Sequence, residues 1–266
     1  MGEISEITLL SENGIVNKIT AGQNISLLSE NSYSFRAGAL RMMWGVADLF
    51  PGLAEFQESI GLPEWIEPGA PWSILASGPD SGLMAQIEHL IESLEEGSDI
   101  SQDSRIDNSA GRVYIHPSAS VGQFVRIEGP CYIGADAEVR HAAYLRKGSW
   151  ICEGAVVGHA TEVKNSIFLP GAKAPHFNYV GDSILGFGVN LGAGTKLSNV
   201  RNDRRKIRLT LGGGARVDTG LRKMGALVGD GSELGCNVVT NPGAILAPAT
   251  MVNPNETVTG WLGPKS

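Results

Sequence analysis

The chain has 266 residues, of which 42% are hydrophobic, so it can bury one large or two modest cores. Its formal net charge of -7 argues against a dedicated nucleic-acid binder, and no apolar run is long enough to span a bilayer. The three cysteines have no CxxC spacing, which argues against a disulfide framework. The N-terminal residues lack a basic and apolar signal region, so we expect a cytoplasmic protein.

Residues 1–110 predict a small mixed α/β region that serves as a cap or a partner-contact surface. Residues 7–28 are typical of short strands separated by polar turns. A first helix is expected to begin at Ser34 and to end before Pro51. Its apolar face would consist of Leu40, Met43, Trp44 and Ala47. Residues 61–77 predict an ordered loop, and no phosphate-binding loop, nucleophile elbow or metal-ligand spacing occurs in this half.

The second helix is the clearest element of this region. Its apolar stripe would consist of Leu83, Ile87, Leu90, Ile91 and Leu94. Asp80 or Ser81 is the expected N-cap, and Gly97 is the expected end. His89 lies off the stripe and is expected to be exposed. The polar residues 97–112 predict a linker to a second domain, residues 111–266.

A hexapeptide repeat begins near Val113 and dominates the rest of the chain. A branched aliphatic residue recurs at every sixth position: Ile115, Val121, Ile127, Ile133, Val139, Leu145, Ile151, Val157, Val163 and Leu169. The residue four positions later is usually small, and one of these small residues, Cys131, is expected to be core filler. Such a period predicts a mainly β fold, a parallel β-helix in which three hexads form one coil. We expect at least six coils across residues 113–258, with Lys164 stacked beside Asp182 one coil later.

Two segments interrupt the repeat. Residues 171–179 predict a loop because Pro175 cannot donate a hydrogen bond to the strand ladder. The repeat resumes at Leu185, Leu191 and Leu197. Residues 201–226 predict an excursion hairpin, in which Ile207, Leu209 and Leu211 alternate with polar residues before a glycine turn. The repeat then returns at Val228, Leu234, Thr240, Leu246, Val252 and Val258.

Interruptions of a rigid scaffold are where binding and catalytic residues are expected. They carry His176 and a run of basic residues: Arg201, Arg204, Arg205, Lys206 and Arg208. A neutral imidazole can accept a proton from an amine that attacks a thioester, and cationic side chains suit phosphate. The structural alternatives are a histidine bonded to backbone and a solvated basic hairpin edge.

The chain resembles a known family from residue 146 to about residue 197. The matching stretches are Leu145-Arg146, Glu162-Val163-Lys164, residues 174–182 and residues 189–195. They resemble the acetyltransferase domain of the bacterial bifunctional N-acetylglucosamine-1-phosphate uridyltransferases. Residues 216–226 resemble the archaeal sugar-1-phosphate nucleotidyltransferase/amino-sugar acetyltransferases.

The resemblance implies a left-handed β-helix that forms a homotrimer with active sites between subunits. It implies an N-acyltransferase that takes acetyl-CoA as cosubstrate, needs no metal and acts on an amino-sugar phosphate or a nucleotide-linked amino sugar. His176 would be the general base, Glu162 would orient it, and Asn199 would face the acyl thioester. The residues implied to hold the sugar substrate are Arg146, Lys164, Tyr179, Asn190 and Arg205. Those implied to contact the cofactor are Ala193, Arg208 and Cys236.

The chain departs from the family at two site positions and at its N-terminus. Val200 replaces a tyrosine of the bacterial family, and Arg205 replaces a lysine, which changes hydrogen-bond geometry. The nucleotidyltransferase domain has no counterpart, so no pyrophosphorylase activity is expected. One alternative is a non-catalytic β-helix that binds or assembles. Another is a γ-type carbonic anhydrase, whose candidate zinc ligands would come from His116, His141, His159 and His176.

Overall fold

The computed structural model describes residues 6–10, 16–20, 45–56, 61–66, 69–78, 80–95, 97–98, 100–211 and 214–263. Residues 1–42 and 43–266 form two compact units. In the first unit, β1 (Glu6–Leu10) pairs antiparallel with β2 (Val16–Thr20), so short strands occur where they were predicted. All the elements that follow belong to the second unit.

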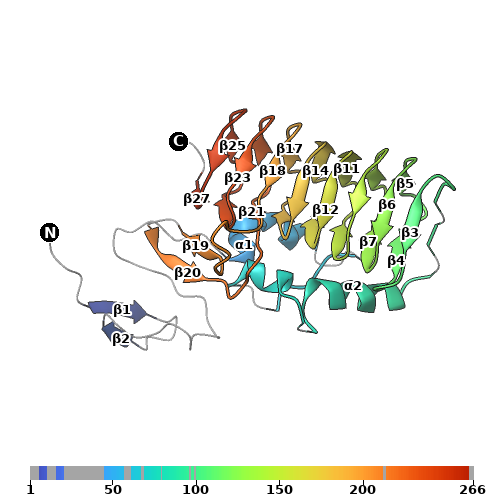
Figure 1. The fold of residues 1–266 in the computed structure, drawn as a ribbon. Helices are drawn as coiled ribbons and strands as arrows, with labels where there is room; N and C mark the ends of the chain where they lie inside the picture. Colours follow the sequence, from blue (N-terminus) through green and yellow to red (C-terminus); the bar gives the residue numbers. More distant parts are fainter. Residues whose placement is uncertain are drawn as a thin grey trace. The chain divides into compact units, whose positions relative to one another are not determined.

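Three parallel sheets make up most of the second unit, and each coil adds one strand to each sheet (Figure 1). Sheet I consists of β4 (Val113–Ile115), β7 (Cys131–Ile133), β10 (Ser149–Ile151), β13 (Ser166–Phe168), β16 (Ile184–Leu185), β21 (Ala226–Val228), β24 (Ala244–Leu246) and β27 (Trp261–Leu262). Sheet II consists of β5 (Ser120–Val121), β8 (Glu138–Val139), β11 (Val156–His159), β14 (Lys173–His176), β17 (Asn190–Leu191), β22 (Glu233–Leu234) and β25 (Met251–Val252). Sheet III consists of β3 (Arg105–Asp107), β6 (Arg126–Glu128), β9 (Tyr144–Leu145), β12 (Glu162–Lys164), β15 (Tyr179–Gly181), β18 (Lys196–Leu197), β23 (Val239–Thr240) and β26 (Thr257–Val258).

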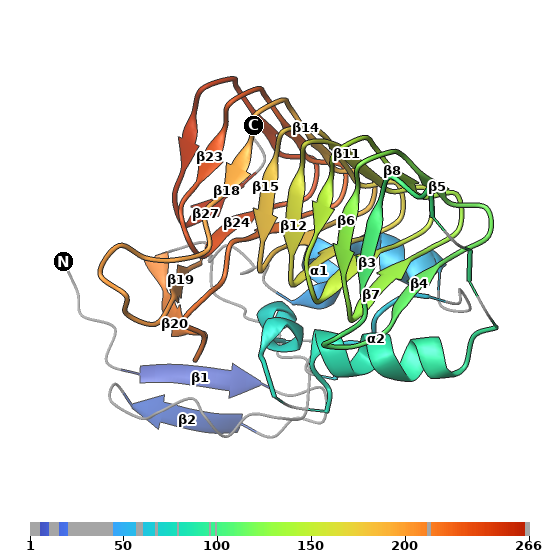
Figure 2. The same ribbon diagram turned by 45° about the vertical axis from the view of Figure 1, so that its right-hand side comes forward.

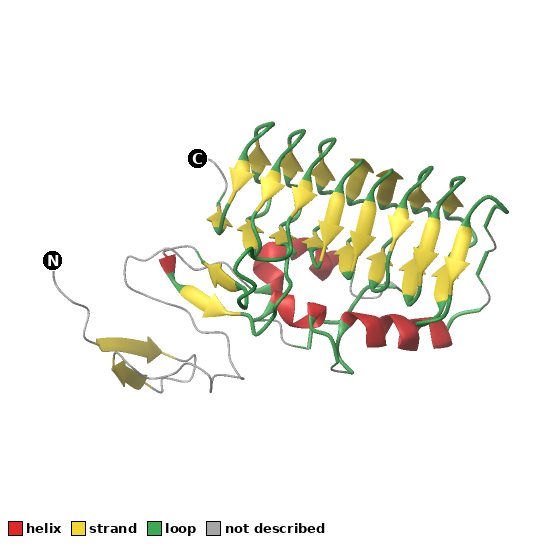
Figure 3. Ribbon diagram, in the orientation of Figure 1, coloured by secondary structure: helices red, strands yellow, loops and turns green. Residues whose placement is uncertain are grey.

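The chain passes through sheets I, II and III in turn, and Figures 1 and 2 show that the coils are left-handed. The seven strands of sheet II mark seven coils, which confirms the predicted minimum of six. Strands dominate this unit, and the few helices lie beside it (Figure 3). The predicted fold class, a left-handed parallel β-helix with a small mixed N-terminal region, is confirmed.

The aliphatic residues of the hexads form one continuous core inside the coils. Nine of the ten residues from Ile115 to Leu169 are buried, and Val121 in the first coil is half-buried against the core. Thr240 occupies an inward position after the hairpin and is also buried. Cys131 is buried in this core, and burial raises the pKa of its thiol, as expected of core filler.

One register change alters which residues point inward. Partners one coil apart are 18 residues apart from β4 to β10, but 17 apart from β10 to β16. The shorter coil places Phe168 opposite Ile151 and inside the core. Leu169 is buried on the outer side, so the prediction that it continues the inward row is wrong.

The predicted loop over residues 171–179 is also wrong. β14 lies between β11 and β17 in sheet II, and His176 at its end is opposite His159. Pro175 fits in β14 because β14 pairs with β17 only at Lys173, so the N–H that proline lacks is not needed in that ladder. The neighbouring backbone is close: a Cβ at Gly158 would lie 1.7 Å from the Pro175 carbonyl oxygen.

The excursion hairpin is confirmed. β19 (Arg208–Thr210) pairs antiparallel with β20 (Arg216–Asp218), between β18 and β21, and the turn residues 212–213 lie outside the described residues. Ile207, Leu209 and Leu211 are buried, whereas Arg208 is exposed. The hairpin therefore has one apolar side and one basic side.

Four short helices cover the outer face of sheet I (Figures 1 and 3). They are α1 (Val46–Leu49), η1 (Pro51–Glu55), η2 (Pro71–Leu75) and α2 (Leu83–Glu92). Their apolar residues share one buried cluster with outward residues of sheet I, such as Trp150 and Ile167. The Trp150 indole N–H donates to the Gly61 carbonyl at 2.8 Å, and Asp230 accepts from the Gly52 N–H at 2.8 Å.

The boundaries of the N-terminal elements differ from those predicted. α2 has Gly82 as its N-cap and ends at Glu92, before Gly97, while His89 is exposed as expected. Residues 34–44 of the predicted first helix lie outside the described residues, and α1 contains only the part after them. β3 lies within the predicted linker and pairs with β6, so the β-helix begins before Val113.

Candidate active site

The outer face of sheet III carries several of the predicted substrate-binding side chains. Arg146, directly after β9, donates from Nη1 to Glu162 Oε1 at 2.9 Å, and Glu162 lies one coil later. The Arg146 guanidinium also lies 5.9 Å from the centre of the Tyr144 ring. About a third of each side chain in the Arg146–Glu162 pair is exposed, so a phosphate group has access to the guanidinium.

Asp182 is a buried carboxylate at the edge of the same face. Its side chain is 5% exposed and accepts hydrogen bonds from Lys164 Nζ at 3.3 Å and from Asn165 Nδ2 at 2.9 Å. The Asn199 amide, one coil later, donates to the other carboxylate oxygen. The predicted proximity of Lys164 and Asp182 is confirmed, but their predicted stacking is wrong, because the coil is one residue shorter and Gly181 lies opposite Lys164. Asn165 also donates to the Leu75 carbonyl at 3.1 Å, which connects η2 to this network.

Tyr179 lies beside both groups. It is opposite Glu162 in the strand ladder, and a Cβ at Gly181 would lie 2.6 Å from its hydroxyl oxygen and 2.7 Å from Asn199 Nδ2. Burial raises the pKa of the Tyr179 hydroxyl, and the charges of Glu162 and Asp182 raise it further. The phenol is therefore protonated at neutral pH and can donate a hydrogen bond to a ligand.

His176 lies at the corner where sheet II passes into sheet III, and it is exposed. Two predicted cofactor residues stack in the next two coils at this corner. The Gly194 N–H donates to the His176 carbonyl at 3.0 Å, and the Asn237 N–H donates to the Ala193 carbonyl at 2.8 Å. Cys236, next to Asn237, is exposed. The fold therefore places His176, Ala193 and Cys236 in one row.

Glu162 contacts Arg146, and no contact with His176 is found among the described residues. The His176 backbone N–H donates to Asn178 Oδ1 at 3.0 Å, and its ring lies 6.3 Å from that of Phe177. An orienting role of Glu162 on His176 thus has no direct hydrogen bond to support it.

The same corner carries a row of aromatic side chains. The rings of His141 and His159 stack with centroids 5.4 Å apart, and the rings of Phe124 and Phe177 meet them edge-on. Phe124 and Phe177 have φ of 58° and 37°, and they are 60% and 55% exposed. Ala160, at the same corner of another coil, has a φ of 49°, so this conformation belongs to the turn. The exposure of the two phenylalanine rings is what makes an apolar patch at this corner.

Asn190 lies apart from the other predicted substrate residues. It is on β17 in sheet II, and its amide donates to Glu233 Oε2 at 3.0 Å. Arg146 and Lys164 lie at sheet III, a different side of the β-helix. Within one chain, the structure therefore does not bring Asn190 to the other residues of the predicted set.

Arg205 and Arg208 line a cavity of about 1060 Å³ between the excursion and the last coils, which we call the hairpin groove. Its lining residues are Ser198, Val200, Arg201, Asn202, Asp203, Arg205, Lys206, Arg208, Thr210, Arg216, Asp218, Asn241, Pro242, Gly243, Thr259 and Gly260. The two arginines, predicted to serve different ligands, thus share one groove. Val200 lines it too, where the bacterial family has tyrosine.

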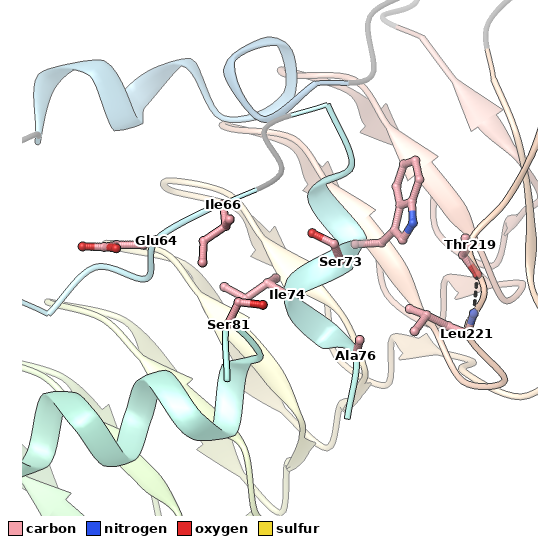
Figure 4. A pocket seen from close by; sticks show the side chains of 9 residues that line it. Glu64, Ile66, Ser73, Ile74, Ala76, Ser81, Thr219 and Leu221 are labelled. Carbon is pink, nitrogen blue, oxygen red and sulfur yellow. Dashed lines mark hydrogen bonds between the residues drawn. The ribbon is translucent and has the colours of Figure 1, made fainter. Parts of the chain in front are cut away.

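A smaller cavity of about 240 Å³ separates η2 from the returning strand of the excursion (Figure 4). Ile74 and Trp72 lie on its η2 side, and Thr219 and Leu221 on the other. The Leu221 N–H donates to Thr219 Oγ1 at 3.1 Å. The lining mixes polar and apolar side chains in nearly equal number, and it includes none of the residues that the sequence predicted for the site.

Two residues near the site escaped the sequence reasoning. Asn165 links Asp182 to η2, and nothing in the hexad pattern marks it. Lys223 is exposed and directly precedes Met224, whose N–H donates to the Asn199 carbonyl at 3.0 Å. Counting backwards from the returning repeat at Val228 would have located this lysine.

The described part of the chain contains no helix that could cross a membrane. Across the same residues, no group of three His, Cys, Asp or Glu side chains could hold a metal ion. His141, His159 and His176 occupy one row, whereas His116 follows β4 at another corner and contacts Ser118.

No protein-family model matches the chain. A bifunctional sugar-1-phosphate nucleotidylyltransferase/acetyltransferase of Sulfurisphaera tokodaii is 33% identical over 199 residues, which cover 75% of this chain and 47% of that protein. The bifunctional protein GlmU of Methanococcus maripaludis is 34% identical over 113 residues, which cover 42% of this chain and 27% of that protein. The chain therefore spans less than half the length of these bifunctional relatives.

An Escherichia coli protein described as uncharacterized acetyltransferase YaiX is 32% identical over 164 residues, which cover 62% of this chain and 71% of that protein. This similarity extends over most of the relative, and the parallel β-helix described above is the fold that the hexapeptide repeat predicts. The chain therefore belongs to the hexapeptide-repeat, β-helix acetyltransferase family and is related to the acetyltransferase part of GlmU.

Proposed function

We propose that the chain is a CoA-dependent N-acetyltransferase whose acceptor is an amino-sugar phosphate or a nucleotide-linked amino sugar. The observation that carries this proposal is the row of His176, Ala193 and Cys236 at the border of sheet III. On the outer face of that sheet, Arg146 and Tyr179 offer the cation and the hydroxyl donor that a sugar phosphate needs. The names of the relatives support both acetyl transfer and a sugar substrate.

In the proposed reaction, the acceptor amine attacks the thioester carbonyl carbon. The new bond is N–C, the C–S bond breaks, and His176 accepts the proton that the amine loses. The same proton then passes to the CoA thiolate. Backbone N–H groups near Ala193 are proposed to stabilise the oxyanion. Asn199 is proposed to face the thioester, and its bond to Asp182 would hold it in place.

We further propose a cyclic homotrimer in which sites lie between copies. Asn190 at sheet II and Arg146 at sheet III would meet if sheet II of one copy faced sheet III of the next. The exposed Phe124 and Phe177 lie at the corner between these two sheets, where such a neighbour would cover them. The corner thus supplies an apolar contact for the assembly.

The test is CoA release from acetyl-CoA, measured with a panel of amino-sugar 1-phosphates. His176→Ala should lower kcat by ~10²–10⁴, which is the usual effect of losing a general base. His116→Ala is the matched control, because His116 lies at another corner, where it contacts Ser118, and its loss should leave kcat nearly unchanged. Equal turnover of wild type and His176→Ala would contradict the base assignment.

The second candidate function is a β-helix that binds without catalysis. It is favoured by the Lys164 amino group, which already pairs with buried Asp182 and has a side chain only 14% exposed. If no amino-sugar phosphate releases CoA from the folded protein, this second function replaces the first.

A further inference from the structure

The excursion after β18 concentrates positive charge. Residues 201–223 contain eight of the 21 Lys and Arg residues of the chain but only two of its 28 Asp and Glu residues. This segment therefore carries a net charge of +6, whereas the rest of the chain carries -13. Ile207 and Leu209 anchor the segment in the cluster that covers sheet I, so its charged residues are left on the outer side. Charge gathered in this way on a rigid support indicates an anionic ligand.

The hairpin groove has several cations that carboxylates do not neutralise. Arg201 Nε donates to Asp203 at 2.8 Å, and the closest contact of Arg208 with Asp218 is 3.9 Å. Among the described residues, no carboxylate lies within ion-pair distance of three further cations that line the groove. These are Arg205, Lys206 and Arg216. Their guanidinium and ammonium groups are therefore free to pair with phosphate oxygens.

The other wall of the groove is polar and uncharged. Asn241 Nδ2 donates to Thr259 Oγ1 at 2.7 Å, and both residues line the groove from neighbouring coils. Ser198 and Val200 also line it, and they flank Asn199, which belongs to the network on sheet III. The groove thus begins beside the candidate active site, and one extended ligand can occupy both.

We propose that the hairpin groove binds the diphosphate of a nucleotide-containing ligand, with Arg205, Lys206 and Arg216 pairing with its oxygens. The inference rests on the proposed function, in which both CoA and a nucleotide-linked amino sugar carry such a diphosphate. The several oxygens of a diphosphate suit a groove lined by three cations, and its uncharged residues leave room for the nucleoside. The groove volume of about 1060 Å³ matches a ligand of that size.

The test is calorimetric titration of the full chain with CoA, with a uridine-diphosphate-linked amino sugar and with an amino-sugar 1-phosphate. The double variant Lys206→Gln/Arg216→Gln should weaken binding of the diphosphate ligand at least ~10-fold, since charged hydrogen bonds are lost. Binding of the monophosphate should not change. Arg112→Gln, at an exposed arginine far from the groove along the β-helix, is the matched control and should bind like wild type.

The outcomes separate the two sources of diphosphate. Weaker binding of CoA assigns the groove to the acyl donor, and weaker binding of the nucleotide sugar assigns it to the acceptor. Wild-type affinity of the double variant for both ligands, or no binding of either ligand to the wild type, would overturn the proposal. If the double variant transfers acetyl groups with unchanged KM values, the proposed role of the groove in diphosphate binding is overturned and the proposed function stands. If the wild type binds the diphosphate ligand, the double variant binds it more weakly and neither transfers an acetyl group, the groove proposal stands and the proposed function is overturned.

Discussion

Asp182 is the residue on which the sheet III network depends. Asp182→Asn would place an amide against the Asn165 and Asn199 amides and remove the partner of Lys164. Breaking a buried pair usually costs about 3–5 kcal/mol, so we expect a loss in unfolding free energy near the lower value. We also expect a raised KM for the acceptor. Urea denaturation and steady-state kinetics measure the two effects.

The control for this prediction is Asp203→Asn. Asp203 pairs with Arg201, but both side chains are about 40% exposed and solvent screens the pair, so its loss should lower the unfolding free energy far less than the loss of Asp182. Equal losses in the two variants would show that Asp182 has no special structural role.

Asp230 should give a distinct pH dependence. Burial raises its pKa above the usual 3.8, although it accepts hydrogen bonds from the backbone of Gly52 and Phe187. The folded protein thus holds this proton more tightly than the unfolded chain. Its stabilising effect is present below pH 3.8 and is lost as the pH rises through the folded-state pKa. Wild type should therefore lose stability relative to Asp230→Asn over that interval, as urea denaturation at several pH values would show. A difference that does not vary with pH would contradict this assignment.

At the scale of the strand, the inward hexad position decides stability. Ile133 is fully buried in the middle of the core, and Ile133→Ala should cost ~2–5 kcal/mol. Val121 holds the same hexad position in the first coil but is half-buried, so Val121→Ala should cost only about 1 kcal/mol. Thermal or urea unfolding gives both values, and a reversed order would show that the coils do not share one continuous core.

The strands could be predicted from sequence where the period stayed constant, and not where it changed. A period of six fixes which residue points inward, so Ile133 and Leu191 were placed correctly. Where a coil is one residue shorter, the missing residue can come from any of its corners. The hexad period alone does not show which corner has lost it. Pro175 suggested a loop because proline cannot donate a hydrogen bond to the strand ladder. In the structure it lies in a strand, at a position where the neighbouring strand does not need that N–H donor.

At the scale of the molecule, the candidate site depends in part on contacts between distant segments, which the sequence could not predict. The period predicted that Lys164 and Asp182 are neighbours, and they form an ion pair, although in the shorter coil the ladder partner of Lys164 is Gly181. It carried no information on Asn165, whose partner in η2 is distant in sequence, or on the covering of sheet I by the N-terminal helices. Those contacts depend on packing between segments that follow no repeat.

The last prediction concerns assembly. Light scattering should give about three times the chain mass of 28.1 kDa for the wild type. Phe124→Ser/Phe177→Ser should dissociate the trimer and abolish acetyl transfer together, because the corner contact and the shared site would be lost at once. Ile66→Ser is the control: Ile66 is 68% exposed but lies in the N-terminal segment, away from this corner. It should remain trimeric and active.

A wild type that is monomeric at micromolar concentration would contradict both the trimer and the shared site. A double variant that stays trimeric would move the interface elsewhere on sheets II and III.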